Sequence, residues 1–235
     1  ITTKTNEKLE ILNQYFKTAD DKDKLWVIAL FTGRRPKRSV SSTLLKTWCA
    51  ELIDLPLWLF DECYNNVGDL SETIALLLPN NTKSSTIEKP LHHYIERLLQ
   101  LEKASEEDKK DFILSTWNEL NTAGERFVFN KLFSNTFRIG VSQQLLIKSL
   151  SIVHVIPATD VTYRLSGNWN PAKITYEQLL FESNITTDIS KPYPFYLAYP
   201  VDDNVENIGS CEDWQAEWKW DGIRGQLIKR ENNLF

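Results

Sequence analysis

The sequence predicts a mainly helical fold, followed near the C-terminal end by the first β-strands of a second domain. Three observations support this prediction: apolar residues at helical spacing over residues 7 to about 181, signals for helix starts and ends between them, and a change in composition near residue 188. We therefore divide the chain into residues 1–187, which are mainly α, and residues 188–235, which begin a β-containing domain.

The helical part shows both the spacing and the capping residues of amphipathic helices. Leu9 and Leu12 begin a series of apolar residues that recur three and four positions apart, as on one face of a helix. Ser105 and Thr122 each stand three residues before an acid, the capping-box pattern, and Ser142 is placed to cap a further helix. These signals predict helix starts near residues 105, 122 and 142.

Beyond residue 188 the pattern becomes that of extended chain. Three prolines between positions 192 and 200 exclude a helix there. Residues 215–220 are typical of a strand, Asp221-Gly222 is a tight-turn dipeptide, and residues 224–230 resume the alternation. A lone hairpin is only marginally stable, and the chain contains no Met, so we expect a truncated segment of a longer protein.

The charge is unevenly distributed. The net charge is −5, but Arg34, Arg35, Lys37 and Arg38 place four positive charges within six residues. A protein that is acidic overall can still present a basic face to phosphates. From the residues alone, a solvated loop explains this cluster equally well.

Metal, disulfide and membrane sites are not indicated. The three cysteines include no Cys-x-x-Cys pair, so we expect reduced, buried thiols. The pair His92-His93 has no spaced acid or cysteine partner and predicts surface histidines, whereas His154 lies among apolar residues and predicts a core histidine. The acidic stretch of residues 20–23 lacks calcium-loop spacing and predicts a solvated loop. No apolar run approaches the length of a membrane span.

The most specific pattern lies near the C-terminal end, at Lys219-x-Asp221-Gly222-x-Arg224. Glu217 stands two residues before the lysine and so shares its strand face, while Arg224 follows the turn and can return toward the same place. A short Lys-x-Asp-Gly taken alone is more typical of a surface hairpin. Three neighbouring tryptophans favour a functional site instead.

This segment resembles the K-x-D-G-x-R signature of the covalent nucleotidyltransferases, which are DNA ligases, RNA ligases and mRNA-capping enzymes. The wider context, residues 193–200 and 214–228, resembles bacterial ATP-dependent DNA ligases of the multi-domain type. The N-terminal DNA-binding domain of that family is similar to residues 2–8, 30–38, 68–73 and 130–142. The resemblance therefore covers nearly the whole chain.

The resemblance implies an ATP- and Mg²⁺-dependent DNA ligase in which residues 188–235 begin an α+β nucleotidyltransferase, or adenylation, domain. In such enzymes a lysine attacks the α-phosphate of ATP, AMP passes to the 5′-phosphate of a nick, and the 3′-hydroxyl displaces it. Transferred to this sequence, Lys219 is the nucleophile, Glu217 accepts from the adenine amino group, and Arg224 contacts the ribose or the nick phosphate.

The same resemblance implies nicked double-stranded DNA as the partner. Gly140 permits close approach of the backbone to phosphate, and the helix that starts after Ser142 favours an anion at its N-terminus. From local sequence alone, an ordinary helix–helix turn explains these two residues better. The candidate DNA contacts are Arg34, Arg35, Lys37, Arg38, Lys131, Arg138, Gly140 and Ser142.

The resemblance further implies a monomeric, cytoplasmic bacterial enzyme, associated with the nucleoid, that acts in DNA repair, replication or recombination without a membrane partner. Because the metal-binding motifs and OB-fold of such enzymes would follow Phe235, we expect these 235 residues alone to form no lysyl-AMP. An AMP adduct on Lys219 of this chain would contradict that expectation. Two alternatives stay open: an RNA ligase or capping-type nucleotidyltransferase, and a non-catalytic helical DNA-binding module.

Overall fold

The computed structural model describes residues 2–80, 89–133, 140–167, 169–182, 204, 207–215, 217, 218, 222, 225–230 and 232–234. Over these residues the chain is mainly helical, as predicted. In chain order the elements are α1 (Thr5–Thr18), α2 (Asp21–Phe31), α3 (Ser42–Leu52), α4 (Leu57–Val67), α5 (Leu70–Leu77), α6 (Leu91–Gln100), η1 (Leu101–Lys103), α7 (Glu106–Glu119), α8 (Ala123–Phe133), α9 (Gln143–His154), α10 (Ala158–Leu165), α11 (Tyr176–Leu180), η4 (Cys211–Asp213), β1 (Lys229–Arg230) and β2 (Asn233–Leu234).

The three predicted hydroxyl caps are present at α7, α8 and α9. In each, the side-chain oxygen accepts a hydrogen bond from the backbone N–H three residues further on, at 3.1 Å for Ser105, 3.2 Å for Thr122 and 3.2 Å for Ser142. Each bond satisfies one of the amides that a helix start leaves without an intrahelical partner. The starts of these helices are therefore determined locally.

The acidic stretch of residues 20–23 is not the solvated loop predicted from the sequence. Asp20 caps α2, and its Oδ1 accepts from the Lys22 amide at 2.9 Å. Asp23 lies in the first turn of α2 and accepts from the amides of Leu91 and His92, at 3.2 and 2.8 Å. Because Pro90, the residue before α6, makes no side-chain cap bond, Asp23 serves as a cap for α6 from 68 residues away.

His92 and His154 are both half-buried, and each has a side-chain partner. His92 is half-buried, and its Nδ1 lies 2.7 Å from Asp23 Oδ1, so the prediction of a surface histidine was wrong for this residue. His154 is half-buried as well, and its Nε2 lies 2.6 Å from the hydroxyl of Tyr176. The predicted core histidine is therefore confirmed as a partnered side chain at the edge of the core.

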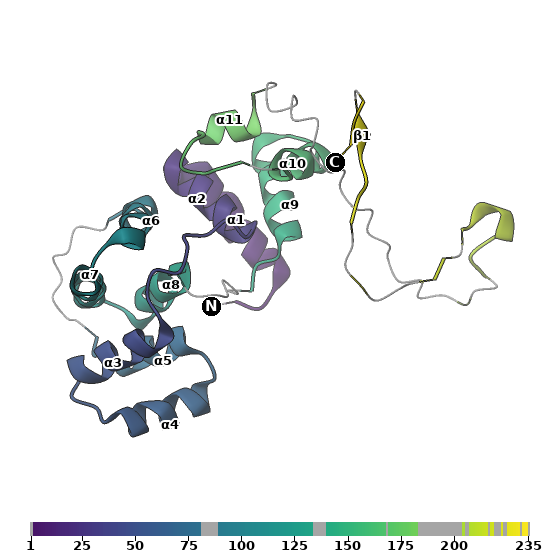
Figure 1. The fold of residues 1–235 in the computed structure, drawn as a ribbon. Helices are drawn as coiled ribbons and strands as arrows, with labels where there is room; N and C mark the ends of the chain where they lie inside the picture. The colour runs from purple at the N-terminus through teal and green to yellow at the C-terminus, as the bar shows by residue number, and fades with distance from the viewer. Residues whose placement is uncertain are drawn as a thin grey trace.

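The helices form two groups joined at α2 (Figure 1). In one group α9 packs against α1, α10 and α2, and α11 packs against α10 and α2. In the other, α5 packs against α8, α4 and α3, while α7 contacts α3 and α6 contacts α8. Helix α2 contacts α6 of this second group, so the same helix belongs to both.

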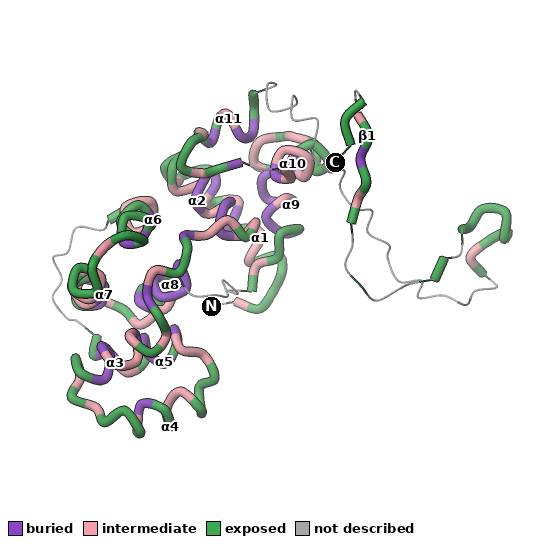
Figure 2. Tube along the Cα trace, viewed as in Figure 1, coloured by how far each residue is buried: buried purple, intermediate pink, exposed green. Residues whose placement is uncertain are grey.

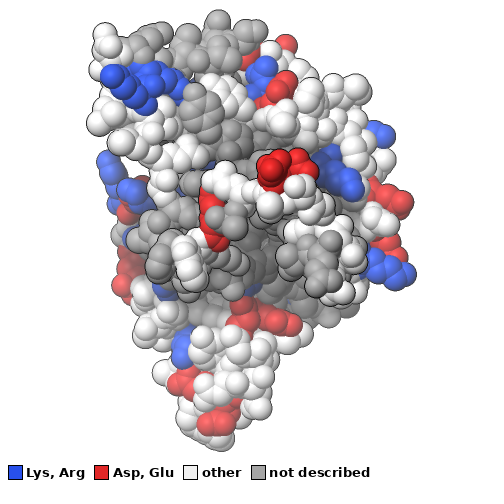
Figure 3. Space-filling model, turned by 90° about the vertical axis from the view of Figure 1, so that its right-hand side faces the viewer, with Lys and Arg blue, Asp and Glu red and all other residues white. Residues whose placement is uncertain are grey.

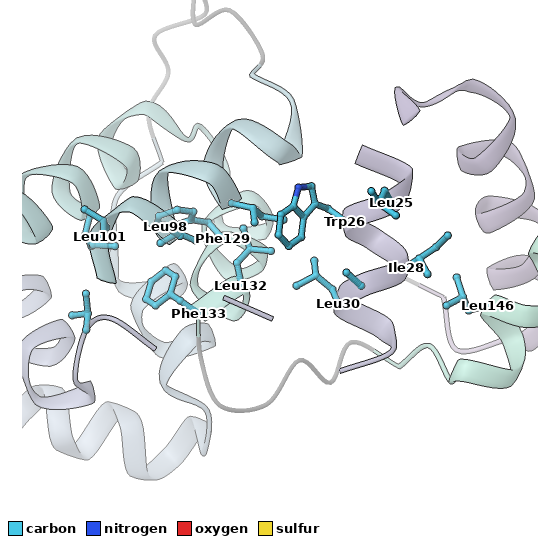
Figure 4. Packing of buried hydrophobic residues seen from close by; sticks show 14 of the residues in the cluster. Leu25, Trp26, Ile28, Leu30, Leu98, Leu101, Phe129, Leu132, Phe133 and Leu146 are labelled. Atoms are coloured by element: carbon cyan, nitrogen blue, oxygen red, sulfur yellow. The ribbon is translucent and has the colours of Figure 1, made fainter. Parts of the chain in front are cut away.

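Helix α2 is apolar on two sides, and Figure 4 shows why. Trp26 and Leu30 face Leu132 of α8, whereas Ile28 lies toward Leu146 of α9. All five of these side chains are buried in a single apolar cluster that extends from α1 to α11. A helix that is apolar around its axis is expected in the interior, and α2 has this position.

Near the C-terminal end the described residues contain little β structure. Gln215, Glu217 and Trp218 are exposed and lie in no strand, so the strand predicted for residues 215–220 is not found at these positions. Figure 2 shows that most of the described chain between α11 and β1 is exposed. Instead β1 pairs antiparallel with β2, and Asn232 between them has a positive φ of 66°. A pair of strands this short is not stable without further strands. It therefore does not establish the start of an adenylation domain, which stays a prediction.

A helix that crosses a membrane needs about 20 consecutive, mostly apolar residues. Within the described ranges, no single helix has the length and apolarity needed to cross a membrane; α9 and α10, bent by 120°, meet those criteria only when taken together.

Candidate nucleic-acid interface

The four clustered cations lie on the connection between α2 and α3, and residues 33–38 are called the basic loop below. Gly33 begins it with a positive φ of 84°, and Pro36 is buried. Lys37 is exposed, and its Nζ lies 3.0 Å from Glu102 Oε1. Arg38 is exposed as well and donates to the Val40 carbonyl at 2.9 Å. An exposed lysine and an exposed arginine on one ordered connection can reach phosphate oxygens.

Arg34 differs from its neighbours because its guanidinium faces the protein. Its Cζ lies 4.2 Å from the ring centroid of Trp169. Its Nη2 donates to the carbonyls of Gly167 at 2.6 Å and Leu165 at 3.2 Å. Burial lowers the pKa of Arg34, although an arginine remains charged in proteins. A DNA contact by Arg34 stays a prediction, and its present contacts are internal.

Two of the predicted contacts, Arg38 and Lys131, meet at one cavity although 93 positions separate them. The cavity measures about 250 Å³ and lies between α3, α5 and α8. Lys131 is 4% exposed, and its ammonium is ion-paired with Asp69, the N-cap of α5. Ser42 and Asn130 add polar groups to the same wall. Lys131 therefore lies inside this cavity and not on the open surface that its sequence context suggests.

The pKa of Asp69 reflects two opposing effects in this cavity. Burial raises the pKa of the carboxyl, but hydrogen bonds from Lys131 and from the backbone amides of Ser71 and Glu72, with the lysine charge, outweigh it and lower the pKa overall. The Asp69 carboxyl is therefore ionised at neutral pH. Of the three charged groups at this cavity, Asp69 is paired with Lys131, so Arg38 gives the cavity wall a net positive charge. This charge favours an anion.

Gly140 and Ser142 lie where the chain enters α9. Gly140 has a positive φ of 75°, and its carbonyl accepts from Lys8 Nζ at 2.7 Å. A Cβ at Gly140 would lie 3.2 Å from that ammonium. Ser142 caps α9, as predicted. Lys8 was not among the predicted site residues, because no local pattern indicates a partner 132 residues away.

Most of the remaining predicted residues lie outside the described part of the chain. Arg138, Lys219 and Arg224 lie outside the described residues. Glu217 is described and exposed, and its Oε1 accepts from Gln215 Nε2 at 2.5 Å. The arrangement of the predicted nucleotide site therefore stays a prediction.

No metal centre is found in the part of the chain that the structure describes, where no three His, Cys, Asp or Glu side chains come together. The exposed carboxylate of Glu217 does not by itself form a Mg²⁺ site, since this ion requires near-octahedral oxygen ligands. The three cysteines are free thiols, as predicted, but only Cys49 is buried, and this burial raises its pKa to about 12. Cys63 is half-buried and Cys211 is exposed, so the expected burial was wrong for these two residues.

The face of the molecule drawn in Figure 3 carries no continuous basic patch among its described residues. In Figure 3 the described Lys and Arg side chains are interspersed with Asp and Glu across the face shown. The candidate interface therefore depends on particular groups: the basic loop, the cavity of Arg38 and Lys131, and the start of α9.

Known proteins similar to this chain identify its family. The family described as "DNA ligase N terminus" matches residues 1–151. Two curated relatives, each named "Probable DNA ligase", align with 99% of the chain: one from Dictyoglomus turgidum at 26% identity and one from Dictyoglomus thermophilum at 24%. The chain spans 42% of the length of these relatives. Since the family match covers more than half of the sequence, the chain belongs to the ATP-dependent DNA ligase family and carries its N-terminal region.

Proposed function

We propose that this chain is the DNA-binding and nucleotidyl-accepting part of an ATP-dependent DNA ligase that seals nicks in duplex DNA. One observation carries the proposal: the K-x-D-G-x-R segment at residues 219–224 follows a helical region of the DNA ligase family. The helical region supplies the affinity for DNA, and the segment supplies the nucleophile. We expect a monomer that acts in the bacterial cytoplasm at the nucleoid, in repair, replication or recombination.

The proposed chemistry begins at Lys219. Its Nζ forms a bond to the α-phosphorus of ATP, the bond to pyrophosphate breaks, and the amine loses a proton. Roughly one free lysine in a few thousand is neutral at pH 7, so the site must depress this pKa through burial or neighbouring cations. AMP then moves to the 5′-phosphate of the nick, and the 3′-hydroxyl displaces it.

The other two residues of the segment position the nucleotide in this proposal. Glu217 accepts from the adenine amino group, and Arg224 contacts the ribose or the nick phosphate. Mg²⁺ would neutralise charge on the transferring phosphate. Because the described residues supply no ligand set for this ion, we assign no step to it.

DNA contacts are proposed at Arg35, Lys37 and Arg38 on the basic loop, at the cavity of Lys131, and near Gly140. Such contacts bind phosphate and fix orientation without reading bases. A ligase must accept any sequence at a nick, so contacts of this kind suit the proposed activity.

Covalent labelling of the full-length protein tests the catalytic part of the proposal. With ATP labelled at the α-phosphate, wild type should retain label after denaturation, and Lys219→Ala and Lys219→Arg should not. Lys229→Ala, an exposed lysine in β1, is the matched control and should label as wild type does. Undiminished labelling of both Lys219 variants would reject the assignment, whereas an unlabelled wild type that binds DNA would favour a non-catalytic DNA-binding module.

Salt titration of nicked-duplex binding tests the DNA part. The logarithm of the affinity should fall steeply with the logarithm of salt concentration, because phosphate contacts release counterions. Lys37→Gln should reduce this slope by about one. Lys17→Gln removes an exposed lysine at the end of α1 and should leave the slope unchanged. A flat salt dependence in wild type would contradict the phosphate contacts.

A further inference from the structure

We infer that Arg34 and Trp169 form a clamp that holds the basic loop in position for DNA, so that Arg34 acts as a positioning residue and not as a phosphate contact. The inference rests on the proposed DNA binding. It assigns a role to a tryptophan that the sequence did not single out, and it reassigns one of the predicted contacts.

The guanidinium of Arg34 is in contact with groups of the protein on one face and along one edge. One face of Arg34 stacks on the Trp169 ring at 4.2 Å. One edge donates to the carbonyls of Leu165 and Gly167, and Nη1 lies 3.4 Å from the Thr32 carbonyl. Three carbonyls and a ring therefore surround a side chain that would need a free edge to bind a phosphate in bidentate fashion.

The partners of Arg34 are themselves held in place. Trp169 is buried, and its Nε1 donates to the Leu165 carbonyl at 3.1 Å, the same oxygen that accepts from Arg34. The backbone amide of Arg34 donates to the Ala29 carbonyl, in the last turn of α2, at 2.7 Å. The clamp thus ties the start of the basic loop to α2 and to the connection between α10 and α11.

The consequence for DNA binding follows from the position of Arg34. It lies directly before Arg35, Lys37 and Arg38, and Pro36 between them is buried. Fixing the start of so short a connection limits where the next cations can point. A lysine could not replace the arginine, because an ammonium has neither a planar face for the indole nor a forked set of donors.

The experiment measures nicked-duplex affinity at several salt concentrations for the full-length wild type and for Arg34→Ala, Arg34→Lys and Trp169→Leu. All three variants should weaken binding by a similar factor, about tenfold, the loss expected for one stacked and hydrogen-bonded arginine. Trp169→Leu removes no charge, so its weakening can arise only through position. The matched controls Arg97→Lys, which also stacks on a ring, and Trp58→Leu, an exposed tryptophan, should bind as wild type does.

The opposite pattern would overturn the inference. If Arg34 contacts phosphate directly, Arg34→Lys and Trp169→Leu will bind like wild type, while Arg34→Ala will lose about one unit of salt slope. Failure of the proposed function would appear in wild type itself, as weak and salt-independent binding. Failure of the clamp would appear only in the variants, against a wild type that binds.

Limited trypsin digestion without DNA keeps the test decisive if Trp169→Leu folds poorly. Cleavage after Lys37 and Arg38 should be faster in Arg34→Lys than in wild type, because the loop has lost its anchor. Trp169→Phe retains an aromatic face but not the indole N–H, and its cleavage rate should lie between the two. Equal cleavage rates in wild type and Arg34→Lys would show that no clamp holds the loop.

Discussion

At the scale of single residues, Arg126 shows how a charged side chain stabilises the interior. It is 1% exposed and donates to three backbone carbonyls: Leu78 at 3.2 Å, Trp117 at 2.9 Å and Leu120 at 2.9 Å. These carbonyls lie in the last turns or at the ends of α5 and α7, where a helix leaves its C=O groups without intrahelical partners. One arginine therefore completes two helix ends at once.

Replacing Arg126 by Met should be strongly destabilising. Two buried carbonyls and the part-buried carbonyl of Leu120 would lose their donor, and a buried group left unsatisfied costs about 1–3 kcal/mol. We expect a loss of roughly 3 kcal/mol or more in the free energy of unfolding, measured by denaturant titration. Arg97→Met, on the exposed side of α6, is the control and should lose much less. Equal losses in the two variants would contradict the role given to Arg126.

His154 predicts a pH dependence of stability. Burial first, and then the positive charge of Lys24, lower its pKa below the ordinary 6.5. The unfolded chain therefore binds a proton at a higher pH than the folded chain does, and the unfolding free energy falls as pH drops below about 6.5. His154→Gln should flatten the stability profile between about pH 6.5 and 5 relative to wild type. Parallel profiles in this range would rule out the contribution.

At the scale of elements, α2 determines how the two helix groups meet. Trp26 and Leu30 face one group and Ile28 faces the other, and all three are buried (Figure 4). Its start is capped by Asp20, and Asp23 on the same helix caps α6. Helix α2 is therefore both an apolar bridge and a source of polar contacts for its neighbour.

Trp26→Ala should strongly lower the free energy of unfolding, because Trp26 is part of the apolar bridge that α2 forms. Truncating a buried tryptophan removes apolar contacts and leaves a cavity, at a cost of about 3–5 kcal/mol. Trp58→Ala on α4 is the matched control, because Trp58 is 68% exposed and Trp26 only 6%. Denaturant titrations should show a large loss for the first and a change near zero for the second; similar changes would mean that α2 is not a bridge.

At the scale of the whole molecule, the apolar core is one cluster that includes residues from α1 to α11. Helices α10 and α11 pack on α9 and α2, so the helical unit continues beyond residue 151, where the family match ends. A shared core predicts that both helix groups unfold together.

Native-state hydrogen exchange can check this. The most protected amides of α8 and α9, which belong to different groups, should report the same opening free energy to within about 1 kcal/mol, that of global unfolding. A difference of several kcal/mol would show two separately unfolding units joined by α2.

Local patterns predicted much of the helical part correctly. The caps at Ser105, Thr122 and Ser142 form because a hydroxyl and an amide three residues on are close in any helix start. The strand over residues 215–220 was not found at Gln215, Glu217 and Trp218, because a strand depends on hydrogen bonds to neighbours that local sequence does not supply. Lys131 resembles an exposed basic residue in sequence, yet lies in a cavity against Asp69.

The sequence by itself determined the starts of α7, α8 and α9 and the motif around Lys219, because each depends on residues a few positions apart. Only the tertiary structure decided that Asp23 caps α6, that Arg38 and Lys131 share a cavity, and that Arg34 stacks on Trp169. These contacts join residues 68 or more positions apart, and their partners become neighbours only when the apolar core brings the helices together. The same distinction explains why Arg34 looks like a DNA contact in the sequence and is enclosed by the protein in the fold.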